Sequence, residues 1–293
     1  MTIRISPIPG AFAGEVSGID ITTPLARDDA AAIVAGMDRH AVLVFHDQRL
    51  TDDAQRDFTR HFGTLEASPG GNITRMDERR LPLDMQDASN LDRDQKPLAR
   101  DDRRRMFNLG NRLWHSDSSY RAVPAKYSLL SGRIVVDRGG HTEFADMRAA
   151  YDTLDDTTKA EIEDLVCEHS LMYSRGLLGF TELTEQERAM FRPVRQRLVR
   201  THPVSGRRSL FLSAHAGGIV GWPVPEARAF LRDLTEHATQ RRFVYAHVWR
   251  QWDLVMWDNR ATMHRARPFN NDEVRDMHRT TVACETSTME QAA

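Results

Sequence analysis

The sequence has little cysteine, no long apolar run and almost no net charge, and each of these absences excludes a class of protein. Its two cysteines, Cys167 and Cys284, lack the spacing of a metal site, which indicates buried free thiols in a reducing compartment rather than a disulfide framework. No segment approaches the roughly 18 apolar residues that a membrane span needs, and the first residues contain no apolar core of signal-peptide length. A net charge of −2 gives no electrostatic attraction for nucleic acid or an anionic membrane. These features predict a cytoplasmic globular protein with neither of those partners.

The composition is that of an ordinary globular protein, and nothing divides the chain. Its 293 residues are 40% hydrophobic and 28% charged. Arginine far outnumbers lysine, but the arginine runs at 78–80 and 102–105 stand beside acidic residues and indicate solvated surface. We find no internal repeat, low-complexity tract or linker in the sequence. We therefore expect one domain over residues 1–293.

Short apolar segments that predict strands are dispersed along the chain, whereas helical patterns are grouped. The predicted strands are 3–5, 41–45, 126–135, 196–200, 209–212, 243–248, 254–257 and 280–283. Helices are expected at 28–37, after Thr51 as an N-cap, at 146–168 and at 224–239. This arrangement favours a mainly β protein with helical additions (α+β), such as a sandwich or jelly roll, over a doubly wound sheet. Residues 68–112 lack an apolar period, which predicts a long loop that acts as a lid or binding loop, and the alternative is a surface insertion without function.

Two pairs of potential metal ligands each have one residue between them. His115 and Asp117 form one pair, and His141 and Glu143 form the other. In an extended segment, residues two apart project from the same face, so either pair can direct both side chains at one metal ion. The spacing alone does not choose between the two pairs.

A third histidine and two arginines late in the chain make the pattern more specific. With His115 and Asp117, His264 completes a set of two imidazoles and one carboxylate, which suits iron(II) with positions left open for a co-substrate and dioxygen. Arg275 and Arg279 follow at an even separation and would face the same side of one regular strand. Guanidinium groups bind carboxylates through paired hydrogen bonds. The pattern indicates an oxygenase that consumes a 2-oxo acid, and the alternatives are a zinc hydrolase and a non-catalytic β-barrel binding protein.

Several segments resemble the taurine/2,4-dichlorophenoxyacetate dioxygenase family of 2-oxoglutarate-dependent non-haem iron enzymes. The resemblance begins at 14–18 (GEVSG), includes 110–119 (GNRLWHSDSS), 140–152 and 257–260 (WDNR), and ends with the late arginines. It is greatest with the members that cleave aryloxyacetates. It implies a double-stranded β-helix (a jelly roll or cupin-like fold) and iron(II) bound by His115, Asp117 and His264. The side chains of His141 and Glu143 would then point away from the metal.

The resemblance also implies roles for residues outside the triad. Thr142 and Arg275 would bind 2-oxoglutarate, with the arginine on its distal carboxylate, and Arg279 would bind the acidic group of the primary substrate. Asn111 and Ser119 flank the H-x-D pair and are candidates for substrate contact. Because relatives are commonly oligomeric, a homo-oligomer is expected.

The expected reaction is hydroxylation of the carbon between the ether oxygen and the carboxylate of an aryloxyacetate. The resulting hemiacetal collapses to a phenol and glyoxylate, while succinate and CO2 form from 2-oxoglutarate and O2. Retention of Asp117 favours hydroxylation over halogenation, which needs that ligand position for halide. The alternatives are the same chemistry on an alkylsulfonate such as taurine, an alkyl sulfate or another aromatic acid. Taurine-type enzymes hold the sulfonate with a histidine ahead of H-x-D, and no histidine lies between His61 and His115.

Overall fold

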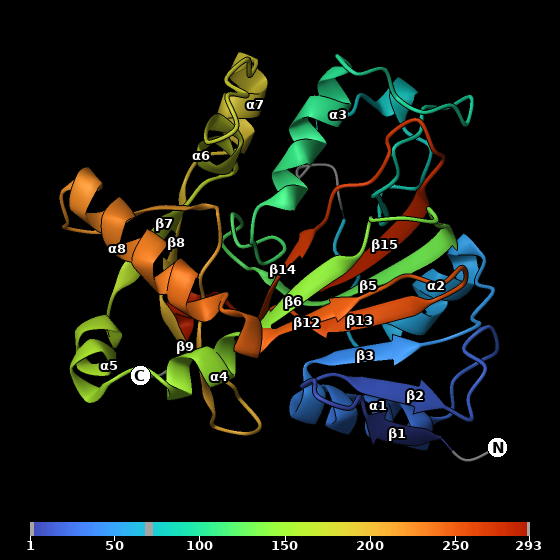
Figure 1. The fold of residues 1–293 in the computed structure, drawn as a ribbon, viewed down its shortest axis with the longest axis horizontal. Helices are drawn as coiled ribbons and strands as arrows, with labels where there is room; N and C mark the ends of the chain where they lie inside the picture. Colours follow the sequence, from blue (N-terminus) through green and yellow to red (C-terminus); the bar gives the residue numbers. More distant parts are fainter. Residues whose placement is uncertain (1–2, 68–72, 292–293) are drawn as a thin grey trace.

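The computed structural model describes residues 3–67 and 73–291, and its centre is a seven-stranded sheet (Figure 1). Neighbouring strands are antiparallel except for β2 and β3, which are parallel. Five of the predicted strands, at 3–5, 41–45, 126–135, 254–257 and 280–283, fall in this sheet. The strand order is β1 (Arg4–Pro7), β2 (Gly14–Ser17), β3 (Val42–Phe45), β13 (Leu254–Asp258), β5 (Ala125–Ile134), β15 (Asp276–Ala283) and β4 (Gln86–Asp87).

Alternate side chains of the large sheet pack into two different cores. On β3, Leu43 packs with side chains of helices α1 (Arg27–His40) and α2 (Asp52–Arg60), whereas the next residue, Val44, packs on the opposite face. The two-residue period of a strand explains why this continuous apolar run is buried on both faces. Both helices were predicted, and the Thr51 hydroxyl caps α2 by accepting a hydrogen bond from a backbone N–H of its first turn.

A second, three-stranded sheet packs on the face of the large sheet that lies opposite α1 and α2. Its order is β12 (Val244–His247), β6 (Thr142–Asp146) and β14 (Thr262–Ala266), and all pairs are antiparallel. Phe144 of β6 packs in one core cluster with Trp257 of β13, so side chains of both sheets share this interior. The molecule is therefore a mixed structure of facing sheets with helical additions, as expected for an α+β protein.

Most of the remaining elements form a region beside the two sheets, on the left of Figure 1. Helix α8 (Val224–Ala238), predicted at 224–239, buries Leu231 and Leu234 in the main core cluster of this region. Around it lie α4 (Met147–Asp152), α5 (Asp156–Ile162), β7 (Val166–His169), α6 (Leu171–Gly176), α7 (Glu185–Met190), β8 (Val194–Arg197), β9 (Val199–Thr201), β10 (Arg208–Leu210), β11 (Ala216–Ile219) and the short helix η3 (Arg241–Phe243).

The continuous helix predicted at 146–168 is wrong. Helix α4 ends at Asp152, and α5 begins after Asp155, whose carboxylate accepts a hydrogen bond from the Thr158 N–H. An aspartate that bonds nearby backbone in this way caps a new helix instead of extending the previous one. Residues 166–169 then form strand β7. The single strand predicted at 196–200 is likewise divided between β8 and β9.

The prediction of a long loop without regular structure at 68–112 is wrong for several short segments from residue 73 onward. The part that the structure describes, from residue 73 onward, contains η1 (Met76–Glu78), strand β4, α3 (Arg103–Asn108) and η2 (Leu109–Arg112). Residues 68–72 lie outside the described residues. Helix α3 begins where the Asp102 carboxylate accepts a hydrogen bond from the Arg104 N–H.

The arginine run at 102–105 is only partly the solvated surface that was expected. Arg103 is exposed and pairs with Glu187 of α7 at 2.7 Å. Arg104 is partly covered and pairs with its own helix cap, Asp102, at 2.7 Å. Both pairs fix the position of α3, one against a neighbouring helix and the other at its own N-terminus.

Two expectations concern the whole chain. Within residues 3–67 and 73–291, no helix combines the length and apolarity that crossing a bilayer requires. Both cysteines are free thiols, but only Cys167 is buried, and its burial raises its pKa to about 12. Cys284 is partly exposed, so the prediction of a buried thiol is wrong for this residue.

Candidate metal centre and active site

His115 and His264 lie directly opposite each other across two backbone segments. The His115 N–H donates to the His264 carbonyl at 3.0 Å, and the His264 N–H donates to the His115 carbonyl at 2.8 Å. Residues that exchange both hydrogen bonds project to the same face of an antiparallel pair. Accordingly the ring centroids are 4.2 Å apart. Strand β14 carries His264, so the small sheet positions one histidine and aligns the other.

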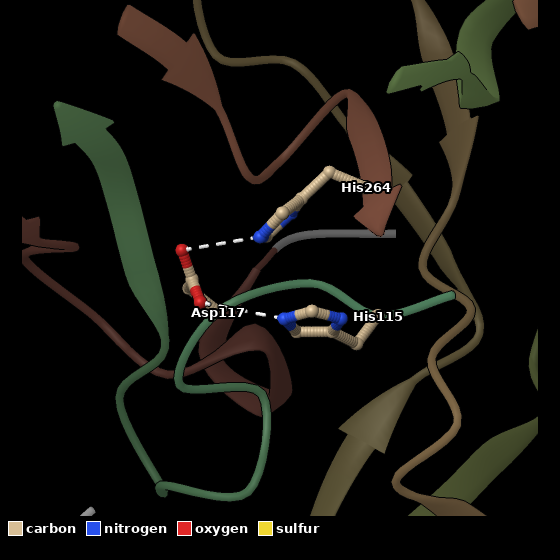
Figure 2. A group of neighbouring side chains, drawn as sticks. All are labelled: His115, Asp117 and His264. Atoms are coloured by element: carbon tan, nitrogen blue, oxygen red, sulfur yellow. Dashed lines mark ion pairs between the residues drawn. The ribbon is translucent and has the colours of Figure 1, made fainter. Parts of the chain in front are cut away.

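Asp117 completes the group, as Figure 2 shows. One carboxylate oxygen lies 3.8 Å from His115 Nε2 and the other lies 3.7 Å from His264 Nε2. Among the histidine, cysteine, aspartate and glutamate side chains of the described residues, these three form the one group whose ligand atoms lie close enough together to hold a metal ion. All three residues are buried, with exposed fractions of 4–6%. The structure therefore brings together the three residues that the sequence singled out.

The rival pair, His141 and Glu143, is directed elsewhere. Glu143 pairs with Arg265 at 2.6 Å and lies 3.8 Å from Arg267. Arg265 follows His264 on β14, so its side chain takes the opposite face of the strand from the buried imidazole. His141 lies 3.7 Å from Glu143 in this partly exposed cluster and is not a member of the buried triad.

A hydrogen-bond network that the sequence did not predict holds Asp117 in place. The Ser128 hydroxyl donates to the carboxylate at 2.7 Å, and the Asp117 N–H donates to Asn259 Oδ1 at 3.0 Å. Asn259 in turn donates to Ser128 Oγ at 3.0 Å and accepts from Trp257 Nε1 at 3.1 Å. The WDNR segment was part of the family resemblance, but its sequence carries no local signal for this role, and neither does Ser128.

The protonation states suit metal binding. Burial lowers the pKa of both His115 and His264, so both rings are neutral at ordinary pH. Burial alone would raise the pKa of Asp117, but the Arg279 guanidinium and the hydrogen bond from Ser128 outweigh it and hold that pKa at about 2. The His115 Nδ1–H donates to the Leu113 carbonyl at 2.8 Å, which leaves Nε2 free to act as a ligand. Two neutral imidazoles and one ionised carboxylate are a donor set that iron(II) accepts.

Arg275 is a buried cation without an acidic partner among the described residues. Its side chain donates to the carbonyls of Ala88 at 3.2 Å and Gly140 at 3.3 Å. Burial lowers its pKa to about 10. It lines a cavity of about 80 Å3. A buried guanidinium without a counterion is costly, and an anion in this cavity would offset that cost.

Thr142 and Arg275 both lie close to the turn at Gly140. Thr142 begins β6, two residues after Gly140, and its buried hydroxyl accepts a hydrogen bond from Trp249 Nε1 at 3.0 Å. Gly140 has φ of 64°, and a Cβ there would lie 3.5 Å from Arg275 Nε. The expectation that Arg275 and Arg279 occupy one regular strand is wrong. β15 begins after Arg275, and its register shifts between residues 276 and 277.

Arg279 lies at the triad itself. Its Nη1 donates to Asp117 Oδ1 at 2.5 Å, and its buried Nε has no partner in the described residues. Strand β4 pairs with β15 at this position, with Gln86 opposite Arg279. The segment around β4, in the predicted lid, is therefore tied to the strand that carries this arginine.

A cavity of about 50 Å3 is lined by His115 and Asp117 on one side and by residues of α3 and α6 on the other. Asn111 lines it and also lines the cavity of Arg275, so it stands between the two. Ser119 is buried and its hydroxyl has no hydrogen-bond partner within the part of the chain that the structure describes, but it is not among the residues that line either cavity. Side chains that sequence reasoning missed complete the lining: Phe107, Tyr120, Leu171, Arg175 and His215.

Comparisons with known proteins agree with this geometry. Residues 4–281 match the family described as "Taurine catabolism dioxygenase TauD, TfdA family". The chain is 44% identical to an alpha-ketoglutarate-dependent 2,4-dichlorophenoxyacetate dioxygenase of Cupriavidus pinatubonensis, over 96% of this chain and 98% of the relative. It is 36% identical to an (S)-phenoxypropionate/alpha-ketoglutarate-dioxygenase of Delftia acidovorans, over 92% of this chain and 91% of that one.

A solved structure is closer in sequence than either relative. It is AAD-2 in complex with Mn(II) and N-oxalylglycine, which is 59% identical and superposes with a TM-score of 0.96 over 98% of this chain and 100% of the other. A buried triad of two histidines and an aspartate is thus found in a chain that matches one family along nearly its whole length. The protein belongs to the TauD/TfdA family of dioxygenases.

Proposed function

We propose that the protein is an iron(II)- and 2-oxoglutarate-dependent dioxygenase that cleaves an aryloxyacetate such as 2,4-dichlorophenoxyacetate. The observation that carries this proposal is the buried group of His115, Asp117 and His264, of which His115 and Asp117 line a cavity together with Arg279. The 44% identity to a 2,4-dichlorophenoxyacetate dioxygenase supports the choice of substrate class.

The three triad side chains are the proposed metal ligands. His115 and His264 would bind through Nε2, and Asp117 would bind through one carboxylate oxygen. Bound iron supplies the activation of dioxygen coupled to oxidative decarboxylation of 2-oxoglutarate to succinate and CO2. Ser128 and Asn259 orient the aspartate, and the Leu113 carbonyl fixes the His115 tautomer.

Arg275 and Thr142 are the proposed 2-oxoglutarate residues. The guanidinium of Arg275 would form two parallel hydrogen bonds to the distal carboxylate, a geometry that lysine cannot reproduce. The hydroxyl hydrogen of Thr142 can donate to the same co-substrate, because the hydroxyl oxygen already accepts from Trp249. Two observations support this role. Arg275 is buried beside an 80 Å3 cavity, and it has no acidic partner among residues 3–67 and 73–291.

Arg279 is proposed to bind the carboxylate of the aryloxyacetate and so to orient one C–H bond toward the metal. Its unpaired Nε supports this role. Asn111 is a proposed substrate contact from the shared wall of the two cavities, and Ser119 is proposed because its buried hydroxyl lacks a partner. Residues 86–88 and Phe107 cover the cavity, which supports a lid role for the segment 68–112.

The chemistry explains the products. Hydroxylation replaces one hydrogen on the carbon between the ether oxygen and the carboxylate. The hemiacetal formed then breaks its bond to the aryl ether oxygen, which leaves as the phenol after taking the hydroxyl proton, and the remaining carbon becomes the aldehyde of glyoxylate. The chain's residues are required for the first step, because the second occurs without catalysis.

The fold type, the number of domains, the oligomeric state and the cellular location are also proposed. The facing sheets support a double-stranded β-helix, that is, a jelly roll of the cupin-like kind, within a single domain over 1–293. A homo-oligomer and a cytoplasmic location are proposed from the family and from the sequence composition.

A single-turnover experiment tests the function. Protein, iron(II), 2-oxoglutarate and 2,4-dichlorophenoxyacetate are mixed without oxygen, and oxygen is then added. We expect succinate and dichlorophenol in equal amounts. Absence of oxygen-dependent succinate would end the proposal. The alternative substrates, an alkylsulfonate such as taurine, an alkyl sulfate or another aromatic carboxylic acid, are compared in the same assay, with sulfite or sulfate as the product of the sulfur acids.

A further inference from the structure

Arg175, at the end of α6, is a second buried cation without an acidic partner in the described part of the chain. The residue is 6% exposed, and its Nε has no hydrogen-bond partner among the described residues. Its Nη1 donates a hydrogen bond to the Ser174 hydroxyl at 3.3 Å. A guanidinium in this state carries an uncompensated charge, which is costly unless an anion joins it.

The surroundings hold this guanidinium in a fixed place. Its central carbon lies 4.5 Å from the ring centroid of Phe107, on α3. On another side it packs against Gly110, where an added Cβ would lie 2.1 Å from Arg175 Nη1. Gly110 opens the segment 110–119 that contains His115 and Asp117. The absence of a side chain at 110 therefore makes room for a positive charge immediately before the H-x-D pair.

The charge lies at the substrate cavity, and no acid of that cavity is free to neutralise it. Arg175 lines the 50 Å3 cavity together with Asp117 and Asp87. Asp117 is paired with Arg279 at 2.5 Å, and Asp87 lies 3.5 Å from Arg80. Arg275 cannot take the same anion, because it lines a different cavity, the one assigned to 2-oxoglutarate.

We propose that Arg175 binds the carboxylate of the primary substrate, which is held between Arg175 and Arg279. The inference rests on the proposed function and deepens it, because it assigns the anion specificity to a pair of arginines. Arg279 is already engaged with Asp117, whereas Arg175 has a free donor and an uncompensated charge. Because its guanidinium stacks on Phe107, binding of the substrate acid also stabilises α3 over the cavity.

The test is equilibrium binding without turnover. Calorimetry with Mn(II) and N-oxalylglycine present compares 2,4-dichlorophenoxyacetate with its neutral analogue 2,4-dichlorophenoxyethanol. In Arg175→Met we expect the acid to bind on the order of a hundredfold more weakly, with less than about a threefold change for the neutral analogue. The affinity for N-oxalylglycine should be unchanged. Arg175→Lys should fall between, because lysine keeps the charge but not the paired hydrogen bonds.

Arg200 on β9 provides a matched control. It is also buried, has unpaired guanidinium nitrogens, and stacks on an aromatic ring, that of Phe211, at 4.7 Å. It lines a separate cavity with Cys284 and not that of the triad. Arg200→Met should leave the affinities for both the acid and the neutral analogue unchanged. The inference is overturned if Arg175→Met binds the acid as the wild type does, or if it loses acid and neutral analogue equally.

Failure of the inference and failure of the proposed function are distinguishable. If the wild type binds no aryloxyacetate, the proposed substrate is wrong, and the variants are compared on whichever sulfonate, sulfate or aromatic acid does bind. A selective loss of that acid in Arg175→Met then supports the inference, and an unchanged affinity overturns it. Should Arg175→Met fail to fold by circular dichroism, the Arg175→Lys comparison of acid with neutral analogue decides in the same way.

Discussion

The Asn259 side chain accepts a hydrogen bond from the backbone N–H of Asp117 and donates one to Ser128, which itself bonds the Asp117 carboxylate. One amide thus fixes both the backbone and the side chain of a proposed metal ligand. Such partners of a ligand typically contribute about 10–100-fold to metal affinity.

Asn259→Ala should therefore weaken binding of Mn(II) or iron(II) by about 10–100-fold, as measured by metal titration. The substitution also leaves the Asp117 N–H and Trp257 Nε1 without an acceptor, which should lower the free energy of unfolding by about 1–3 kcal/mol. Asn270→Ala, at an exposed position, is the control for metal binding and should leave that affinity unchanged. Wild-type metal affinity in Asn259→Ala would contradict the positioning role.

Replacement of a triad member should abolish turnover, and replacement within the rival pair should not. Asp117→Ala and His264→Ala should reduce oxygen-dependent succinate formation by more than about a thousandfold, because each removes one of three ligands. His141→Ala is the matched control, since His141 lies in the partly exposed cluster with Glu143. Succinate production at wild-type rates in either triad variant would refute the ligand assignment.

Arg275→Gln should act on 2-oxoglutarate and spare the substrate. Loss of a buried charge-assisted pair costs about 2–5 kcal/mol, so KM for 2-oxoglutarate should rise by on the order of a hundredfold or more. The dissociation constant of the aryloxyacetate should change little. Arg200→Gln, on a buried arginine that lines a separate cavity, should leave both constants unchanged. An equal effect of the two arginine variants would argue against a co-substrate role for Arg275.

Stability should fall at alkaline pH because of His278. Burial disfavours the charged ring, but hydrogen bonds to Asp276 and Asp52 outweigh it and raise the pKa of His278 to about 9. A histidine whose pKa is raised by folding stabilises the fold fully below its unfolded pKa, about 6.5. That contribution is lost as the pH rises from there through about 9. The upper limit of the effect is about 3 kcal/mol.

Urea unfolding at pH 6 and pH 9.5 measures this loss. His278→Gln should be less stable than the wild type at pH 6 and should show a smaller decrease between the two pH values. The exposed His61 supplies the control, because His61→Gln should retain the wild-type decrease. An identical pH dependence in His278→Gln and the wild type would exclude the Asp52–His278–Asp276 cluster as its origin.

The elements that were predicted correctly are those whose signal is local. The apolar run of β3 and the cap of α2 at Thr51 are defined by neighbouring residues, and both were found. The helix at 146–168 failed because its apolar period continued across Asp155, whose side chain competes for the backbone. Helix α3 was missed because its arginine-rich sequence has little apolar period. Its position also depends on Glu187 of α7, a helix that is far from α3 in the sequence but contacts it in the fold.

The triad could be predicted from the sequence, whereas the contacts around it could not. The two histidines and Asp117 were recognised from residue types and the family resemblance, whereas the pairing of His115 with His264 is a contact between distant segments. Ser128 and Arg175 stand in ordinary sequence surroundings. Nothing local distinguishes a buried, unpaired arginine from the surface arginines in a chain with 40 lysines and arginines. Only the folded arrangement reveals which charge faces the cavity.

The contact between Gly110 and the Arg175 guanidinium has a practical consequence for protein engineering. Even a methyl group at position 110 would occupy the place of Nη1, so Gly110→Ala displaces the cation without removing it. On the proposal that Arg175 binds the substrate acid, this one-carbon change should favour uncharged ethers over acids.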